Sequence, residues 1–259
     1  MKMNKSNCEK AEMLVEVLPY VNRFRDKIIV IKYGGNAMIN EDLKKAVMQD
    51  LLLMKSVGMH PILVHGGGPA INDMLKKLKV ESHFEQGLRV TDKETMEIVE
   101  MVLAGKVNKD IVGTLNQIGG KGIGLSGKDG NLIQARKKYL EKNGEKIDIG
   151  YVGEVEAVNK EMLESLIYSG YIPVISSIGM GKDGMSYNIN ADYVAGAVAK
   201  AVQANKFILL TDVEGIFRDY HYKDSLSSRI TLEDIEALEA NGIISGGMVP
   251  KVDCCIDAL

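Results

Sequence analysis

Several features that would define the class of this protein at once are absent or scarce. The 259 residues contain no tryptophan, five prolines and only 5% aromatic side chains. No apolar run approaches the roughly 20 residues that a membrane helix needs, and residues 1–10 are polar, unlike the start of a signal peptide. We therefore expect no membrane contact and a globular chain, either one large α/β domain or two lobes that share a sheet.

Cysteine and strong charge are also scarce. Cys8, Cys254 and Cys255 form no CxxC pair, and two neighbouring cysteines make a poor structural disulfide, so we expect a reducing, cytoplasmic location. The four histidines lack ligand spacing, and no metal site is predicted. The 32 basic and 35 acidic residues give a net charge of −3 without a basic stripe, which argues against a nucleic-acid partner.

The common nucleotide motifs are missing as well. There is no GxxxxGK[ST], which excludes a P-loop enzyme, and no GxGxxG on the first strand, which disfavours a dinucleotide site. Three glycine-rich turns nevertheless follow apolar segments, at residues 34–35, 66–68 and 179–181. Glycine lets backbone N–H groups approach an anion closely. Together the three turns favour an anionic ligand such as a polyphosphate at the carboxyl edge of a sheet.

The hydrophobic pattern predicts the fold class. Segments 27–31, 60–64, 172–176 and 207–210 are apolar except for one residue at an end of each of the first three, as expected for strands buried on both faces. Helical patterns alternate with them, which predicts an α/β fold around a central, mainly parallel sheet. An antiparallel excursion is expected at 128–158. A capping box at Thr91 and Glu94 is expected to open a helix toward residue 104. A helix at 9–25 is expected to be kinked or interrupted by Pro19.

We divide the chain into a helical extension (1–25), an N-lobe (26–175) and a C-lobe (176–259). The extension is read either as a helix on its own domain or as an oligomerisation arm.

Two lysines are candidates for neutralising phosphate charge. Lys32 ends a buried strand just before a glycine turn, where a lysine is costly unless it is paired or faces a polar site. Lys251 follows a Gly-Gly pair near the start of the last helix. Phosphoryl transfer needs mainly positioning and charge neutralisation, which such lysines supply. The alternatives are a solvated strand end for Lys32 and an ordinary surface lysine for Lys251.

Polar residues at two further positions suggest substrate binding. Asn188, Asn190 and Asp192 alternate at a spacing that places them on one side of an extended segment, with Asp192 at a helix start. The pattern predicts either two amides that bind substrate and a carboxylate that orients cations, or a capped turn without a ligand. Arg89 can bind a substrate carboxylate in a bidentate manner, or pair with Asp92 or Glu94. Another turn, at 211–215, could hold a second ligand moiety or be a plain β-turn.

In this order, the segments IKYGG (31–35), VHGGGP (64–69), GLRVT (87–91), NINAD (188–192), LLTDV (209–213) and GMVPK (247–251) resemble those of the N-acetyl-L-glutamate kinases of the amino-acid kinase superfamily. The resemblance runs from about residue 9 to the end of the chain. It implies a three-layer αβα sandwich with a mainly parallel open sheet, an N-lobe for the amino-acid substrate and a C-lobe for ATP, which carries Mg²⁺. The reaction implied is direct transfer of the γ-phosphoryl group of ATP to the γ-carboxylate of N-acetyl-L-glutamate, a step of arginine biosynthesis.

The resemblance also assigns roles. Lys32 and Lys251 resemble the catalytic lysines on the two sides of the transferred group, and Asp192 resembles the carboxylate that holds both. Two larger sets complete the implied site. The substrate-binding set is Gly35, Gly67, Gly68, Arg89, Asn188 and Asn190. The ATP-binding set is Asp212, Val213, Gly215, Phe217, Ile243 and Ser245.

The resemblance carries expectations about assembly too. Family members continue beyond the helix in which this chain stops, so we expect the C-lobe to lack closing elements and to expose a sheet edge. An N-terminal helix implies a homo-oligomer, a dimer or a hexamer formed through that helix, with arginine as an inhibitor. Two alternatives remain open: a related kinase for another acceptor, glutamate or carbamate, and a non-catalytic ligand-binding or regulatory protein.

Overall fold

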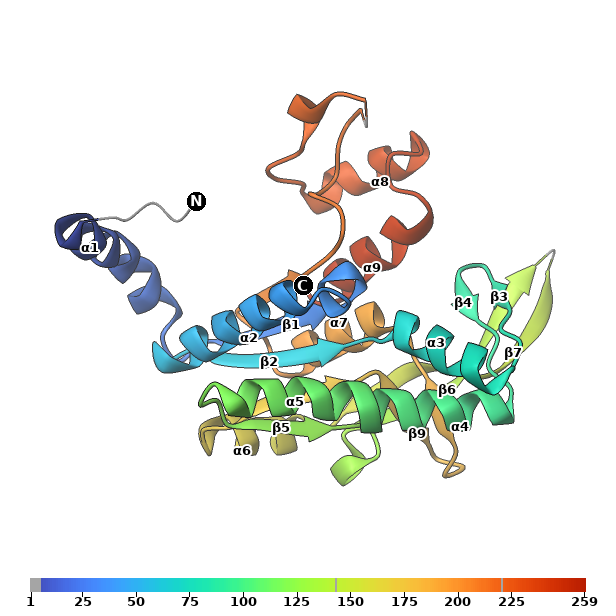
Figure 1. Cartoon of the computed structure of the whole chain (residues 1–259). Helices are drawn as coiled ribbons and strands as arrows, with labels where there is room; N and C mark the ends of the chain where they lie inside the picture. The colour runs from blue at the N-terminus through green and yellow to red at the C-terminus, as the bar shows by residue number, and fades with distance from the viewer. Residues whose placement is uncertain (1–5, 143, 220) are drawn as a thin grey trace.

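A five-stranded parallel sheet organises the molecule (Figure 1). The computed structural model describes residues 6–142, 144–219 and 221–259. The order of the sheet is β11-β1-β2-β8-β5, so β11 and β5 form its edges. The strands are β1 (Ile28–Tyr33), β2 (His60–His65), β5 (Gly122–Leu125), β8 (Ile172–Ser176) and β11 (Lys206–Leu209). The predicted parallel sheet is confirmed.

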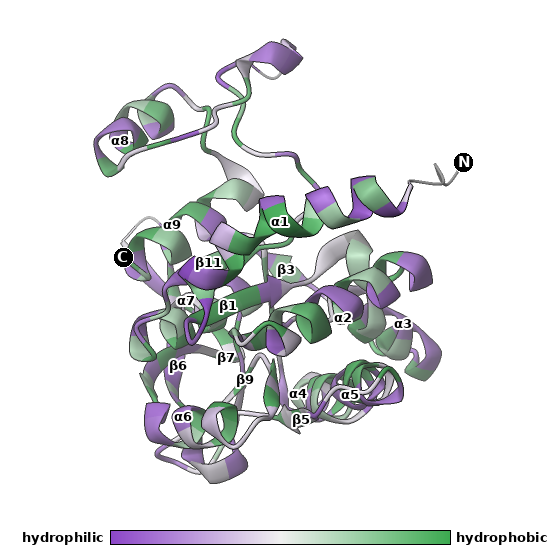
Figure 2. Cartoon of the chain, turned by 90° about the vertical axis from the view of Figure 1, so that its left-hand side faces the viewer, coloured by the Kyte–Doolittle hydropathy of each residue, from purple (hydrophilic) through white to green (hydrophobic). Residues whose placement is uncertain are grey.

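Side-chain alternation along β1 shows how the three layers form. Ile29 and Ile31 point into one hydrophobic cluster and Ile28 and Val30 into another, because neighbouring strand residues face opposite sides. The first cluster is covered by α2 (Glu41–Ser56), α3 (Gly68–Leu78), α4 (Lys93–Glu100) and α5 (Asn108–Gln117), and the second by α6 (Lys160–Tyr168) and α7 (Ala191–Ala201). Figure 2 shows hydrophobic and hydrophilic residues alternating along the helices that flank the sheet.

The long helical stretch after the GLRVT motif differs in detail from the prediction. The N-cap of α4 is Asp92, whose carboxylate accepts a hydrogen bond from the Thr95 N–H at 2.8 Å. Thr91 instead forms an isolated bridge with Gly150, so the predicted capping box is wrong. A π-helical segment (Met101–Val107) joins α4 to α5, so the helix predicted to run toward residue 104 continues to Gln117.

A second β-structure carries the antiparallel excursion. β6 (Ile133–Lys142) and β7 (Glu145–Val158) pair antiparallel, as predicted, and close a small barrel with β9 (Ile178–Gly181) and β10 (Ser186–Asn188). Residues 179–181 therefore lie in a barrel strand, and their prediction as a ligand-binding turn is wrong. A Cβ at Gly179 would meet Ala135 at 2.7 Å, so close strand packing is what requires glycine there. A short hairpin, β3 (Phe84–Glu85) and β4 (Leu88–Arg89), lies beside the barrel.

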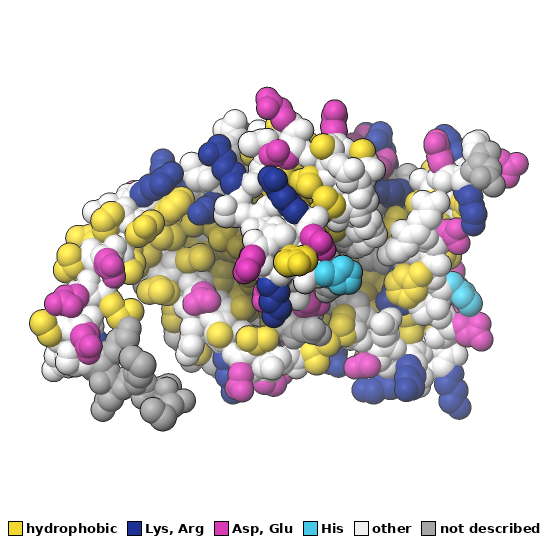
Figure 3. Space-filling model, turned by 90° about the horizontal axis from the view of Figure 1, so that it is seen from above, with side chains coloured by type: hydrophobic (Ala, Val, Ile, Leu, Met, Phe, Trp, Pro, Cys, Tyr) yellow, Lys and Arg dark blue, Asp and Glu magenta, His cyan; other side chains and the backbone are white. Residues whose placement is uncertain are grey.

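Helix α1 (Asn7–Phe24) projects from the body as a separate arm (Figure 1). Pro19 does not interrupt it; the helix continues to Phe24. None of its residues is buried, and hydrophobic side chains along it are exposed (Figure 3). Residues 1–5 of the predicted extension lie outside the described residues.

The C-terminal part contributes α8 (Leu232–Ala240) and α9 (Val249–Asp257), with short 3₁₀ turns at Lys223–Ser225 and Gly246–Met248. Two further 3₁₀ turns, Gly35–Met38 and Asp129–Asn131, follow β1 and β5. Among the described residues, no helix has the length and apolar content required to cross a membrane.

Candidate active site

One carboxylate joins two lysines at the centre of the molecule. The Nζ atom of Lys32 lies 3.0 Å from Oδ1 of Asp192, and Nζ of Lys251 lies 3.1 Å from Oδ2 of the same side chain. The side chains are 11%, 21% and 8% exposed for Lys32, Lys251 and Asp192, so water screens these ion pairs only weakly. The structure thus brings the three predicted catalytic residues together, with one more positive than negative charge.

These three side chains come from three different elements. Lys32 shares the face of β1 with Ile28 and Val30, which is the face that α7 covers. Asp192 lies in the first turn of α7, where its charge complements the helix dipole. Lys251 lies in the first turns of α9, which packs against α7. The alternative readings of both lysines as solvated surface residues are therefore wrong.

A cavity of 240 Å³ lies near this cluster, with Ala191, the neighbour of Asp192, in its wall. We call it the substrate-side cavity because five of the six predicted substrate-binding residues line it, namely Gly67, Gly68, Arg89, Asn188 and Asn190. Asn190 also caps α7, because its side-chain oxygen accepts a hydrogen bond from the Asp192 N–H at 2.8 Å. Asn190 therefore caps α7, as one of the two predictions for the NINAD segment had it, and it also lies in the wall of the cavity.

Helix α3 points its N-terminus at this cavity. Gly67 occupies the N-cap position, and no side chain caps the helix. The first N–H groups of a helix have no partner within the helix, so they remain available to an anion. A Cβ at Gly67 would come within 2.5 Å of Leu103, whereas one at Gly68 would meet nothing within 4 Å. Packing requires glycine at the first position, and open space for a ligand lies at the second.

The guanidinium of Arg89 is fixed by neutral partners. Its Nη2 donates to Oδ1 of Asn72 at 2.5 Å and its Nη1 to Oγ of Ser82, while the Phe84 ring lies 4.6 Å from its Cζ. Burial lowers the pKa of Arg89, which stays a cation. The predicted alternative of an ion pair with Asp92 or Glu94 is not formed. No carboxylate among the described residues pairs with this buried cation, so it is available to an anionic ligand.

A buried polar network around His65 holds the glycine turn at residues 66–68. His65 is fully buried; its Nδ1 lies 2.8 Å from the Gly66 carbonyl oxygen and its Nε2 lies 3.1 Å from Nδ2 of Asn108. Because a carbonyl can only accept, Nδ1 carries the proton and Nε2 accepts from the amide. Burial lowers the pKa of His65 to about 4, so the ring is neutral.

A second, apolar cavity of 290 Å³ lies on the other side of Lys251, between β11, α8 and α9. Two predicted ATP-binding residues line it, Val213 and Gly215. The other four do not. Phe217 bridges to Leu226, the Ile243 N–H donates to Leu238, and Ser245 caps a 3₁₀ turn.

The remaining predicted residues, Gly35 and Asp212, lie against each other where β1 and β11 end. A Cβ at Gly35 would come within 2.6 Å of the Asp212 carboxylate, and the φ of Gly35 is +66°. Both the close approach and the backbone conformation favour glycine there.

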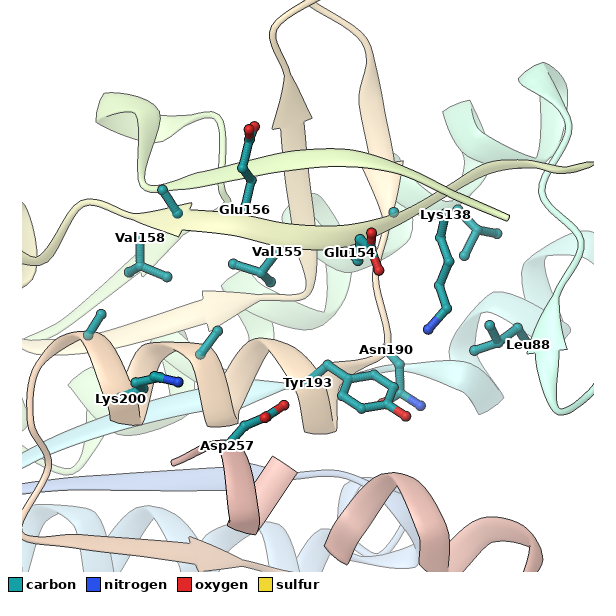
Figure 4. A pocket seen from close by; sticks show the side chains of 15 residues that line it. Leu88, Lys138, Glu154, Val155, Glu156, Val158, Asn190, Tyr193, Lys200 and Asp257 are labelled. Carbon is teal, nitrogen blue, oxygen red and sulfur yellow. The ribbon is translucent and has the colours of Figure 1, made fainter. Parts of the chain in front are cut away.

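A larger cavity, about 590 Å³, lies between β7 and α7 (Figure 4). It shares Leu88, Val152 and Asn190 with the substrate-side cavity. The ammonium group of Lys138 faces the Tyr193 ring, 5.0 Å from its centroid. The lysine pair around Asp192 does not line this cavity, so size alone does not identify the reaction centre.

Some lining residues were not predicted. Ile235 and Cys255 lie in the apolar cavity, and Ser177 and Leu103 lie in the substrate-side cavity. Asn72 and Ser82, which hold Arg89, were also missed. The helical spacing of Leu232 and Ile235 could have indicated an apolar face on α8, but no sequence signal tells which element that face meets.

The arrangement of cations and glycine turns at the carboxyl edge of a parallel sheet is that of a phosphoryl-transfer site, and comparison with known proteins agrees. The model of the amino acid kinase family matches residues 27–259, and the chain belongs to this family. It is 57% identical to the acetylglutamate kinase of Heliobacterium modesticaldum over 256 residues, which cover 97% of this chain and 87% of that protein. Its identity to the acetylglutamate kinase of Desulforamulus reducens is also 57%, with coverage of 98% and 87%.

Solved structures share the fold. A Streptococcus mutans protein of 33% identity superposes with a TM-score of 0.75 over 89% of each chain. The N-acetylglutamate synthase of Neisseria gonorrhoeae, solved with coenzyme A and N-acetylglutamate, gives a TM-score of 0.81 at 20% identity, over 98% of this chain and 56% of that one. At that identity the likeness concerns the fold alone.

Proposed function

We propose that this protein transfers the γ-phosphoryl group of ATP to the γ-carboxylate of N-acetyl-L-glutamate, giving N-acetylglutamyl 5-phosphate in arginine biosynthesis. The observation that carries the proposal is the Lys32–Asp192–Lys251 cluster, with Lys251 in the wall of the apolar cavity and Ala191, next to Asp192, in the wall of the substrate-side cavity. The identity to acetylglutamate kinases supports the choice of acceptor.

In this proposal the substrate-side cavity holds the acceptor. Arg89, whose positive charge has no carboxylate partner among the described residues, binds the α-carboxylate of the substrate. Asn188 and Asn190 contact its polar groups, and the N–H groups at Gly67 and Gly68 face the reacting carboxylate. The apolar cavity beside Lys251 takes the base of ATP, with Val213 and Gly215 in its wall. The N-lobe, 26–175, thus serves the acceptor together with Asn188 and Asn190 of the C-lobe, and the rest of the C-lobe, 176–259, serves ATP. Gly35 and Asp212 lie at the junction of the two.

The chemistry follows from charge. The acceptor carboxylate is already ionised at neutral pH, so the attack needs no general base. Two negative groups must approach each other, and Lys32 and Lys251 offset that repulsion from the two sides of the transferred group. Asp192 holds both ammonium groups at fixed positions, so little reorganisation is needed as charge shifts.

In this proposal, Mg²⁺ enters the site bound to the phosphates of ATP. Both oxygens of Asp192 are engaged by lysines, and among the described residues no group of three or more His, Cys, Asp or Glu side chains is placed to hold a metal. Mg²⁺ usually binds through substrate phosphates and water with few protein ligands. When bound, it neutralises charge on the phosphate chain.

The decisive experiment traps acyl phosphate with hydroxylamine in the presence of ATP. We expect product with N-acetyl-L-glutamate, little with glutamate or carbamate, and none with Lys32→Ala. Product from glutamate or carbamate instead would identify the related kinase for another acceptor. Binding of ATP and N-acetyl-L-glutamate without product would identify the non-catalytic alternative.

We further propose that α1 joins copies of the chain into a homo-oligomer in the cytoplasm. Its exposed apolar side chains support this, since a helix of this kind needs a partner to cover them. The exposed hydrophobic residues on α1 are Met13, Leu14, Val15, Val17, Leu18 and Tyr20. Light scattering should give the molar mass of a dimer or hexamer for the native protein. The Leu14→Glu variant should give a smaller molar mass. Equal masses would refute the role of α1. Inhibition by arginine, which the family resemblance implies, is tested by adding it to the same kinase assay.

A further inference from the structure

Thr91 contacts both of the residues on which the proposed acceptor site depends most, through the backbone carbonyl of Arg89 and the side chain of Asn188. Its hydroxyl lies 2.8 Å from the Arg89 carbonyl oxygen and 3.3 Å from Nδ2 of Asn188. Thr91 is fully buried, so water cannot replace either partner. These contacts connect β4, which carries Arg89, to β10, which carries Asn188.

The direction of the hydrogen bonds follows from their chemistry. The Arg89 carbonyl can only accept, so the Thr91 hydroxyl donates its single proton there. The same oxygen must then accept from Asn188, which requires the NH₂ group of the amide on that side. The carbonyl oxygen of Asn188 makes no hydrogen bond with any described residue. The chain of bonds therefore fixes which end of the Asn188 amide remains for a ligand.

The backbone holds Thr91 rigidly in this position. Its N–H donates to the Ile149 carbonyl at 3.0 Å, and its carbonyl accepts from the Tyr151 N–H at 2.6 Å. Gly150, at φ +79°, lies between these two partners, and a Cβ there would collide with the Thr91 carbonyl. β7 also pairs with β10 at Val152 and Asn188, so one strand locates both ends of the contact.

We propose that Thr91 is a positioning residue for acceptor binding: it links Arg89 to Asn188 and orients the Asn188 amide so that its oxygen accepts a hydrogen bond from the N–H of the acylated amino acid. The inference rests on the proposed function. This inference also bears on specificity. The Asn188 oxygen can only accept a hydrogen bond, so it favours a substrate with an N–H at its α-position over one with a hydrogen-bond acceptor there.

The test compares Thr91→Val, which keeps the shape and removes the hydroxyl, with Thr91→Ser, which keeps the hydroxyl. We expect Thr91→Val to raise the KM for N-acetyl-L-glutamate about tenfold, since it removes the hydroxyl partner of the buried Arg89 carbonyl and of the half-buried Asn188 amide. We expect kcat to change less than about threefold, because the lysines are untouched, and the KM for ATP to stay the same. Thr91→Ser should restore the acceptor KM to within about twofold of the native value.

A double-mutant cycle separates positioning from general packing. If Thr91 acts through Asn188, then Thr91→Val should add little to the acceptor KM of Asn188→Ala, whereas independent effects would multiply. An unchanged acceptor KM in a folded Thr91→Val protein would overturn the inference, as would equal rises in the KM for acceptor and for ATP. Failure of the native protein to phosphorylate N-acetyl-L-glutamate would instead refute the proposed function, so the two failures are distinguishable.

Discussion

The two sides of the Lys32–Asp192–Lys251 cluster are built very differently. On the side proposed to bind the acceptor, Arg89 and Thr91 are buried, and the fully buried His65 lies next to the glycine turn. On the nucleotide side, Ile244 is the sole buried residue among those described between 206 and 250, and α8 buries none. One half of the site is part of the core, and the other half lies on the surface.

This contrast suggests a division of roles. A buried, hydrogen-bonded pocket has its geometry fixed before the ligand arrives, so it selects the acceptor by shape and by paired polar groups. A segment with few buried contacts has low local stability and gains order from its ligand. We expect the acceptor half to be preorganised and the nucleotide half to be completed by ATP. The following predictions test that contrast.

The largest effect is expected where the halves meet. Lys32→Met keeps the length of the side chain and removes its charge, which leaves the transferred group without one preorganised cation. We expect kcat to fall about a hundredfold to a thousandfold, as for removal of an oxyanion donor, with a much smaller change in either KM. Steady-state kinetics measure this.

Lys200→Met is the matched control, because Lys200 lies in the last turn of the same helix that carries Asp192. It should leave kcat nearly unchanged. Equal losses in both variants would mean that the charge of the whole region, and not the Asp192 cluster, supports the reaction.

The second prediction concerns the core of the acceptor half. The pKa of His65 is about 4 in the folded protein, below its ordinary value of 6.5. The unfolded chain therefore binds more protons between these values, and stability is lost as pH falls from about 6.5 to 4, by up to about 3 kcal/mol. Urea unfolding at pH 7 and pH 4.5 measures this loss. His65→Gln should be less stable at pH 7 but show a smaller pH dependence; an equal slope in both proteins would contradict the assignment.

The same contrast explains what the sequence could and could not predict. The apolar segments predicted the parallel sheet, and the motifs that carry the family resemblance pointed to Lys32, Asp192 and Lys251. Of these, only Lys32 lies near the end of a strand of that sheet, whereas Asp192 and Lys251 lie in the first turns of α7 and α9. Thr91 was misread as a cap because its role depends on Gly150, some 60 residues away. The walls of the apolar cavity come from three separate elements, whose mutual packing is not encoded in a local pattern.

The third prediction uses two adjacent glycines to separate packing from ligand binding. Gly67→Ala would force Leu103 to move and should destabilise the fold by about 1–3 kcal/mol. Gly68→Ala meets no protein atom within 4 Å, so its free energy of unfolding should hardly change, while the KM for the acceptor should rise severalfold. Thermal unfolding and kinetics on both variants test this. An unchanged acceptor KM in Gly68→Ala would place the ligand away from this turn.

The smallest effect is expected in the apolar cavity on the nucleotide side. Ile235 lines it, and Ile235→Ala should raise the KM for ATP about threefold to tenfold, which corresponds to about 1 kcal/mol of lost apolar contact. Leu238→Ala is the control, because Leu238 lies on the same helix, is partly buried and does not line the cavity. The acceptor KM should stay the same in both. An equal rise in the KM for ATP in both variants would mean that the stability of α8 as a whole supports ATP binding. If the KM for ATP rose in neither variant, the base of ATP would bind elsewhere, and α8 would not form a wall of the nucleotide site.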